Sequence, residues 1–182
     1  MSLTNSRRLK GAFVYFIPFG VTVDSATVSA TSWPDNDPTT NWTDYAFGCI
    51  ENVQPMREAD TESLLCPSPD GGYILEDEQR ATKDGWMMQT NKYNELIDRL
   101  EYGLASTPVA GVPQTPFAER DRYVDGVVLI QARGLDGTDY HVEQWHARLR
   151  LATVPEWGNS TSKPVVSFQC LQNDLNTFEI PS

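Results

Sequence analysis

The chain has 182 residues, of which 40% are hydrophobic and 21% are charged, a composition typical of a soluble globular protein and not of a disordered one. Its 25 acidic and 14 basic side chains give a formal net charge of -11, which argues against tight binding to nucleic acids or to anionic membranes. No stretch approaches the roughly 18 apolar residues that a membrane-spanning helix needs. We therefore predict one domain over residues 1–182 with no membrane partner.

The N-terminal third has the pattern of β-structure. Residues 9–18 and 20–30 are rich in β-branched and aromatic side chains, and we predict a strand in each. The apolar part of the first is short, contains a proline and lacks a small-residue cleavage site, so we expect a strand and not a secretory signal. A further strand is predicted within "WTDYAFGCIENV" (residues 42–53), where apolar residues occupy both alternating faces.

A charged segment follows, for which we predict a long loop over residues 54–85. It is rich in charge, proline and glycine, and only "GGYIL" interrupts it. A loop of this length inside a compact domain is more often functional than idle. Its acidic group Glu76, Asp77 and Glu78 suits a metal or a contact site, although a solvated face is the commoner use of such a run.

One amphipathic helix is predicted at about residues 91–104. Its apolar residues share one helical stripe, Thr90 or Asn91 can supply the N-cap oxygen, and Gly103 weakens the last turn. The stripe consists of Tyr93, Leu96, Ile97, Leu100 and Leu104. A proline-rich linker over about residues 105–122 then leads back to β-structure.

The C-terminal third predicts two strands joined by a Gly/Asp turn, followed by a third strand in "KPVVSFQCL". The run "VVLI" (residues 127–130) has no polar alternate, so we expect it to be buried on both sides. In a chain with one helix, a second subunit could supply the second cover. Val128 and Ile130 are therefore candidate subunit-interface residues.

Both histidines of the chain fall in "DGTDYHVEQWHARLRL" (residues 136–151). The apolar and polar positions exchange phase near Glu143, which a β-bulge there would explain. Such a bulge would place a polar strip on one face, consisting of His141, Glu143, His146, Arg148 and Arg150. Strand rise separates the two histidines by well over about 12 Å, so we predict no metal site and expect subunit contacts or a lumen wall.

Catalytic motifs are missing: the chain contains no GxSxG, GxGxxG, HExxH or P-loop sequence. Cys49 and Cys170 fall on apolar strand faces, where buried and inert thiols are usual. The five tryptophans could form a sugar platform, but Trp86 and Trp145 fit a core pattern. We predict neither an enzyme nor a bound cofactor.

The order of the elements resembles that of the major tail tube proteins of long-tailed bacteriophages, which are related in fold to the tube protein of type VI secretion. The likeness lies in "FGCIENV" on an early strand, "GWMMQTNKYNELIDRL" from strand to helix, and "WHARLRLATVPEW" before a closing strand that ends in "FQCLQND". These segments cover about two thirds of the chain, and the likeness is one of layout.

The resemblance implies a mainly β fold, an antiparallel β-sandwich or partly open barrel with one flanking amphipathic helix and long loops. It implies a structural virion protein of the tail, assembled in the bacterial cytoplasm, whose hexameric rings stack into a tube. Its partners would be other copies of itself and the tape measure, terminator and baseplate proteins, with DNA only in transit. Residues on the 54–85 segment would then contact the next ring: Arg57, Glu58, Asp60, Glu76, Asp77, Glu78 and Lys83. Alternatives are a carbohydrate- or receptor-binding β-sandwich and another virion component, such as a tail terminator, decoration or minor capsid protein.

Overall fold

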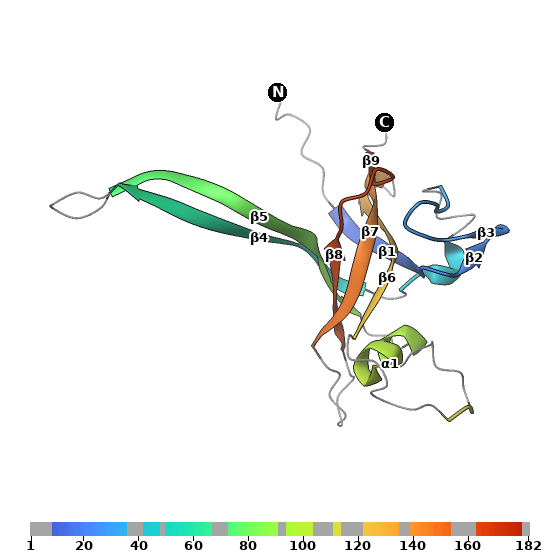
Figure 1. Cartoon of the computed structure of the whole chain (residues 1–182). Coiled ribbons are helices and arrows are strands. Elements are labelled where there is room, and N and C mark those ends of the chain that lie inside the picture. Colours follow the sequence, from blue (N-terminus) through green and yellow to red (C-terminus); the bar gives the residue numbers. More distant parts are fainter. Residues whose placement is uncertain are drawn as a thin grey trace.

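The fold is a curled antiparallel sheet that forms a half-barrel with one helix (Figure 1). The prediction of a mainly β fold with a single helix is confirmed, and the sheet takes the partly open barrel form. The computed structural model describes residues 9–35, 42–47, 50–66, 73–90, 94–103, 111–113, 122–134, 139–153 and 163–179. Within that part, no helix is both long and apolar enough to cross a membrane.

The main sheet has the strand order β1-β6-β7-β8-β5-β4, with β9 paired to β7 off this path. All of its pairs are antiparallel. Four of these strands were predicted along most of their length, namely β1, both strands of the C-terminal hairpin and β8, and the strand predicted at "GWMMQT" is the inner end of β5. The strands are β1 (Leu9–Pro18), β4 (Ile50–Cys66), β5 (Tyr73–Thr90), β6 (Tyr123–Gly134), β7 (Asp139–Thr153), β8 (Val165–Cys170) and β9 (Thr177–Glu179).

Two hydrophobic cores lie on opposite faces of the sheet, and β6 contributes to both. Val128 and Ile130 belong to the first core, while Val127 and Leu129, which alternate with them, belong to the second. The first core also contains Val14, Phe16, Met88, Leu149 and Phe168, and the second contains Ile17, Val28, Trp42 and Val142. The run "VVLI" is buried on both sides, as predicted, because one chain builds a core on each face.

The second core is covered by the segment that follows β1. Residues 20–30, predicted as one strand, instead form a small hairpin of β2 (Thr22–Val23) and β3 (Ala26–Thr27). Asp24 and Ser25 make its two-residue turn with φ of 47° and 68°, the left-handed values that tight hairpin turns require. The strand predicted over residues 42–53 is also wrong in its first part, where a 3-10 helix, η1 (Thr43–Tyr45), precedes β4.

The helix α1 (Glu95–Tyr102) lies inside the predicted range. Its N-cap is Asn94, whose side chain accepts a hydrogen bond from the backbone N–H of Ile97 at 3.0 Å. Thr90 cannot serve as the cap, because β5 extends to that residue and its N–H donates to the carbonyl of Pro164. Gly103 ends the helix in a left-handed conformation with φ of 63°, a geometry that glycine adopts without strain. Ile97 and Leu100 of the predicted stripe are buried, whereas Tyr93 and Leu104 lie outside the described residues.

The predicted loop over residues 54–85 is wrong, because strands β4 and β5 occupy it as a long hairpin. The ladder runs from Ile50–Thr90 to Cys66–Tyr73, and only Gly85 to Gln89 of β5 also pair with β8. Figure 1 shows the rest of the hairpin extending away from the sheet; we call residues 57–66 and 73–84 the arm. Of the predicted linker over residues 105–122, the described part is 111–113 and Arg122.

Candidate functional site

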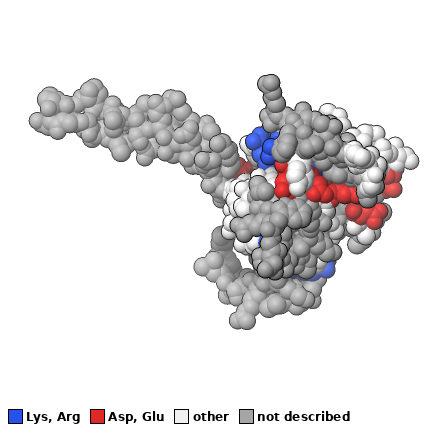
Figure 2. All heavy atoms as spheres, turned by 90° about the horizontal axis from the view of Figure 1, so that it is seen from below, with Lys and Arg blue, Asp and Glu red and all other residues white. Residues whose placement is uncertain are grey.

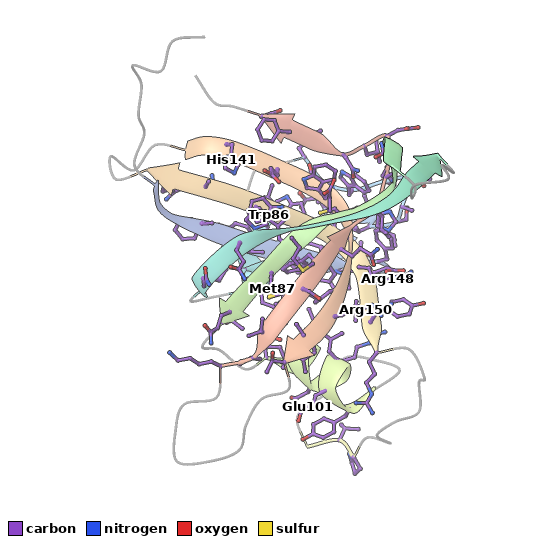
Figure 3. All side chains as sticks on the ribbon, turned by 90° about the vertical axis from the view of Figure 1, so that its left-hand side faces the viewer. Trp86, Met87, Glu101, His141, Arg148 and Arg150 are labelled. Atoms are coloured by element: carbon purple, nitrogen blue, oxygen red, sulfur yellow. The ribbon has the colours of Figure 1, made fainter. Side chains whose placement is uncertain are left out.

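The polar residues predicted as one strip of β7 lie on two opposite faces. β7 pairs with β6 without a register shift from residue 141 to residue 150, so a bulge near Glu143 is wrong. Strand alternation therefore places His141 and Glu143 on one face and His146, Arg148 and Arg150 on the other. In Figure 3, His141 lies well away from Arg148 and Arg150.

The hydrophobic pattern of β7 inverts because different faces are buried along its length. Val142 belongs to the second core, whereas Ala147 and Leu149 belong to the first core on the other side. Gln144 shares the face of Val142 and is buried, and its amide donates to the carbonyl of Pro34 at 2.8 Å. The change of phase thus marks a change of core and not an inserted residue.

Glu143 is the centre of a polar cluster on the first-core face. Its Oε2 atom accepts hydrogen bonds from the indole Nε1 atoms of Trp86, at 3.1 Å, and of Trp145, at 3.2 Å. Its Oε1 atom lies 3.6 Å from Nε2 of His141, an ion-pair geometry when the imidazole is protonated. The Glu143 side chain is only 12% exposed, so these partners replace much of its lost hydration.

Within the described part of the chain, no three His, Cys, Asp or Glu side chains lie close enough together to hold a metal ion, and the Glu143 cluster is no exception. His141 and Glu143 supply two groups on one face. His146 cannot join them, because it lies on the opposite face of the same strand.

His146 is partly buried and packs against its own chain. Its ring lies 4.9 Å from that of Phe19, and its Nε2 atom is buried without a hydrogen-bond partner among the described residues. Burial lowers the pKa of His146 from its ordinary value; the Asp125 carboxylate opposes this effect and Arg148 adds to it. The neutral form is therefore favoured at this position.

Arg148 is held within the chain. Its Nε and Nη2 atoms donate to the two carboxylate oxygens of Asp125 at 2.7 and 2.9 Å, and its guanidinium lies 4.0 Å from the ring centre of Tyr123. Arg150 approaches the same ring at 5.5 Å and is exposed. Of the residues predicted for this face, Arg150 is exposed, while His146 and Arg148 are partly exposed.

Val128 and Ile130 were predicted to meet a neighbouring subunit, and this prediction is wrong for direct contacts. Their side chains are 0% and 1% exposed within the single chain. The second face of β6 is covered by residues of the same chain, including Trp42 and Val28, so no second subunit is needed there.

The arm carries all the residues predicted for contacts between rings. Register partners near its root include Arg57 with Asp84 and Glu58 with Lys83, while Asp60 lies farther along β4. Glu76, Asp77 and Glu78 lie toward the far end of the ladder, opposite residues 62–64. The positions of these residues follow from the backbone, and their side chains lie outside the described part.

The root of the arm is fixed by two adjacent residues of β5. Gly85 is the last residue paired with β8, and a Cβ atom there would overlap the carbonyl oxygen of Phe168, so the close approach needs glycine. Trp86 follows and is anchored to Glu143 of β7. The local sequence pattern indicates a core position for Trp86 but not this anchoring role, because the contact joins residues 57 positions apart.

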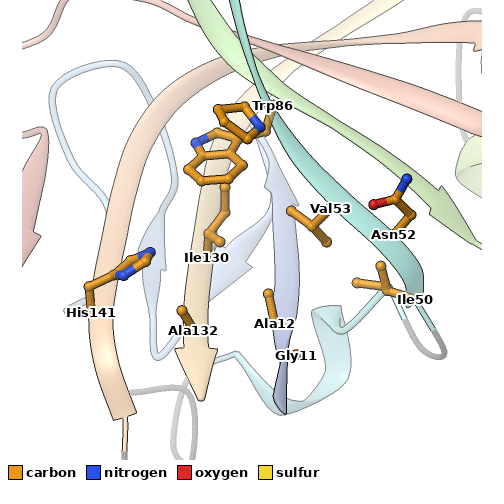
Figure 4. Close-up of a pocket in the computed structure, with 10 residues that line it drawn as sticks. Gly11, Ala12, Ile50, Asn52, Val53, Trp86, Ile130, Ala132 and His141 are labelled. Carbon is orange, nitrogen blue, oxygen red and sulfur yellow. The ribbon is translucent and has the colours of Figure 1, made fainter. Parts of the chain in front are cut away.

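An apolar groove of about 440 Å³ opens beside this root, between the two end strands β1 and β4 (Figure 4). Small residues of β1 and β6 form part of its lining, with Trp86 and His141 beside them and Val53 facing them from β4. The residues that define it here are Gly11, Ala12, Val53, Trp86, Ala132 and His141. We refer to this hollow as the β1–β4 groove.

The described tryptophans are packed and do not form a surface platform. Trp42 is wholly buried and its indole donates to the carbonyl of Asp35 at 2.8 Å, while Trp33 packs against the second core. Trp86 and Trp145 pack against the first core, as their sequence pattern predicted. Trp157 lies outside the described residues.

Cys170 is partly buried, and burial raises the pKa of its thiol to about 12, with the nearby carboxylates of Glu143 and Asp84 adding to the effect. This agrees with the prediction of an inert thiol for Cys170. Cys49 and the side chain of Cys66 lie outside the described part.

Acidic side chains gather on the side of the molecule that carries the β2–β3 hairpin and η1 (Figure 2). Asp24, Asp35 and Asp44 in this region are all exposed.

Comparison with known proteins does not add a family: no protein-family model matches the chain, and no curated protein matches it significantly.

Proposed function

We propose that this chain is a structural virion protein, the subunit of a phage tail tube. Six copies close a ring, the rings stack into a tube in the cytoplasm of the bacterial host, and DNA passes through the finished tail. The order of the predicted elements, the length of the arm and the open form of the sheet support this proposal.

The arm is the observation that carries the proposal. From Gly85 to Tyr73 the ladder continues for 12 residues beyond the last pairing with β8, which corresponds to about 40 Å. A two-stranded hairpin is at best marginally stable in water by itself. An arm of this length is therefore expected to rest on another molecule, as a contact between stacked rings requires.

The open half-barrel supports the same proposal. β1 and β4 end the strand order, and among the described residues β4 has a ladder with β5 alone, while β1 gains only an isolated bridge from Tyr15 to Ala46 beyond its pairing with β6. Free strand edges promote uncontrolled association, and a closed ring of identical subunits is one way to cover them.

The charge of the chain suits a conduit for DNA. A net charge of -11 gives no cationic surface on which a phosphate backbone would be held by counterion release. An acidic wall would repel the backbone and let it slide. The tape measure, terminator and baseplate proteins would be the further partners of such a tube.

Electron microscopy of the protein at increasing concentration tests the proposal. We expect rings with a central hole and short stacks of them, with a matching rise in sedimentation coefficient. A protein that stays monomeric at high concentration would overturn it. Closed rings that never stack would point instead to a tail terminator, and binding to capsids to a decoration or minor capsid protein.

A further inference from the structure

We infer that the far end of the arm of one copy docks in the β1–β4 groove of a second copy. The inference rests on the proposed self-assembly and goes beyond it by naming the surface that receives the arm. It depends on four features: the composition of the arm, the direction of the arm, the chemistry of the groove and the free strand edges beside the groove.

The far end of the arm is apolar, unlike its middle. Between residues 57 and 62 and between 76 and 83 the two strands carry six acidic and three basic residues. The last positions of the ladder are different, with Leu65 paired to Ile74 and Cys66 paired to Tyr73. The apolar end consists of Leu64, Leu65, Cys66, Tyr73, Ile74 and Leu75.

These apolar positions lie where the core of their own chain cannot reach them. The ladder places them about 33–40 Å beyond Gly85, and Figure 1 shows the arm pointing away from the sheet. Burying one such side chain on another surface is worth roughly 1.5–3 kcal/mol. A charged stem with an apolar end is the composition expected of a segment that inserts into another surface.

The β1–β4 groove has the complementary chemistry. Its lining residues are apolar apart from Asn52 and His141, and glycine and alanine at positions 11, 12 and 132 leave room above the sheet. Its volume of about 440 Å³ falls in the range of roughly 300–1,000 Å³ in which proteins enclose small ligands, enough for a few aliphatic side chains. Leucine and isoleucine side chains would fill it without leaving a buried charge unpaired.

The strand edges beside the groove suit an extended occupant. The groove lies between β1 and β4, and residues 50–56 of β4 have β5 as their one ladder partner within the described part. A hairpin also presents unpaired backbone groups along its two outer edges. Strand addition would therefore provide backbone hydrogen bonds, while the apolar side chains enter the groove.

The occupant must come from another copy. Pro55 and Trp86 line the groove and are register partners at the root of the arm. The apolar pair Leu65 and Ile74 lies twelve residues along β5 from Trp86, and a continuous ladder cannot fold back onto its own root. A head-to-tail contact of this kind repeats into stacks or filaments, whereas reciprocal exchange of arms between two copies would stop at a dimer.

Cysteine cross-linking tests the contact with the native Cys66 at the arm end. Val53→Cys places a thiol on the groove wall, and Ser167→Cys is the matched control, because Ser167 pairs with Arg150 on the opposite face of the sheet. Oxidation, or a short bismaleimide, should link Val53→Cys protein into covalent dimers and longer ladders. The ladder should disappear when Cys66→Ser is added and should be absent from Ser167→Cys protein.

A second measurement does not depend on thiol geometry. Leu65→Asp should weaken association about ten- to hundredfold, the effect expected from losing one buried leucine, whereas Thr61→Asp in the middle of the arm should change it little. Assembled particles without the Val53→Cys ladder, or equal effects of both aspartates, would overturn this inference and leave the tube proposal standing. Ladders without rings or tubes would do the reverse, and a monomer without ladders would overturn both.

Discussion

Replacing Glu143 by alanine tests whether its carboxylate joins β5 to β7. The substitution removes the shared acceptor of two indole N–H groups, at 3.1 Å from Trp86 and 3.2 Å from Trp145. It leaves both donors in a part-buried environment, where water replaces the lost partner only incompletely.

The expected loss follows from these two bonds. A hydrogen bond to a charged group contributes about 1.5–3 kcal/mol, but the substitution also removes the desolvation cost of a carboxylate that is only 12% exposed, so the net loss is smaller than the sum of two bonds. We therefore expect Glu143→Ala to lower the free energy of unfolding by about 2–4 kcal/mol. Glu143→Gln keeps an oxygen that can accept both bonds, and its loss should be about 1 kcal/mol.

Urea unfolding followed by circular dichroism measures these losses, provided that the slope with denaturant stays the same in all variants. Glu179→Ala is the matched control, because Glu179 is an exposed residue of β9, and it should change the free energy of unfolding by less than about 0.5 kcal/mol. A Glu143→Ala variant as stable as this control would refute the bridging role of the carboxylate.

Three further predictions concern buried groups. Gly85→Ala should cost on the order of 2–3 kcal/mol in urea unfolding, because the new Cβ atom overlaps the Phe168 carbonyl and the strands must shift. The pKa of His146 is lowered in the folded state, so the unfolded chain binds more protons at this residue, and the free energy of unfolding should fall as the pH drops below about 6.5. Urea unfolding at pH 7.5 and at pH 5 measures this fall, which should be smaller for His146→Gln than for the unchanged protein. Cys170, with a pKa of about 12, should be thiolate in only about one molecule in ten thousand at pH 8. A variant that keeps Cys170 and lacks the other two cysteines should therefore react with iodoacetamide far faster when unfolded in urea than when folded.

Strong local patterns allowed part of the fold to be predicted. β1, β6 and β8 are runs of β-branched and aromatic residues, and α1 has apolar residues at helical spacing, so the local pattern and the tertiary environment agree. The cap could not be singled out from the local pattern, since "TNKYN" contains three suitable residues. Asn94 is the cap, not Thr90 or Asn91 as predicted, because its side chain accepts the hydrogen bond from the N–H of Ile97.

The change of phase in β7 could not be interpreted from the strand alone. A bulge and a change of the buried face both invert the hydrophobic pattern. A bulge would shift the pairing of β7 with β6, whereas a change of the buried face requires a second core on the other side of the sheet. Both depend on contacts between residues far apart in the sequence. The bulge hypothesis therefore placed His141 and His146 on one face, whereas the structure separates them.

The arm was missed for a different reason. Glutamate and aspartate are depleted in strands, and residues 57–62 and 76–83 have almost no apolar alternation. What organises them is the ladder itself, which begins at a packed root and continues outward. Charged residues on an otherwise free strand edge also discourage pairing with other chains.

The complete burial of β6 changes where assembly contacts are to be sought. Because one chain covers both faces of the "VVLI" run, the body of the subunit has a full core before it meets a second copy. In the proposed tube, subunits would therefore meet through surfaces outside the two cores: the apolar end of the arm, the β1–β4 groove and the strand edges beside it. His141 would then matter as part of the groove lining, with Glu143 holding Trp86 at the root of the arm, and not as part of a polar strip shared with His146.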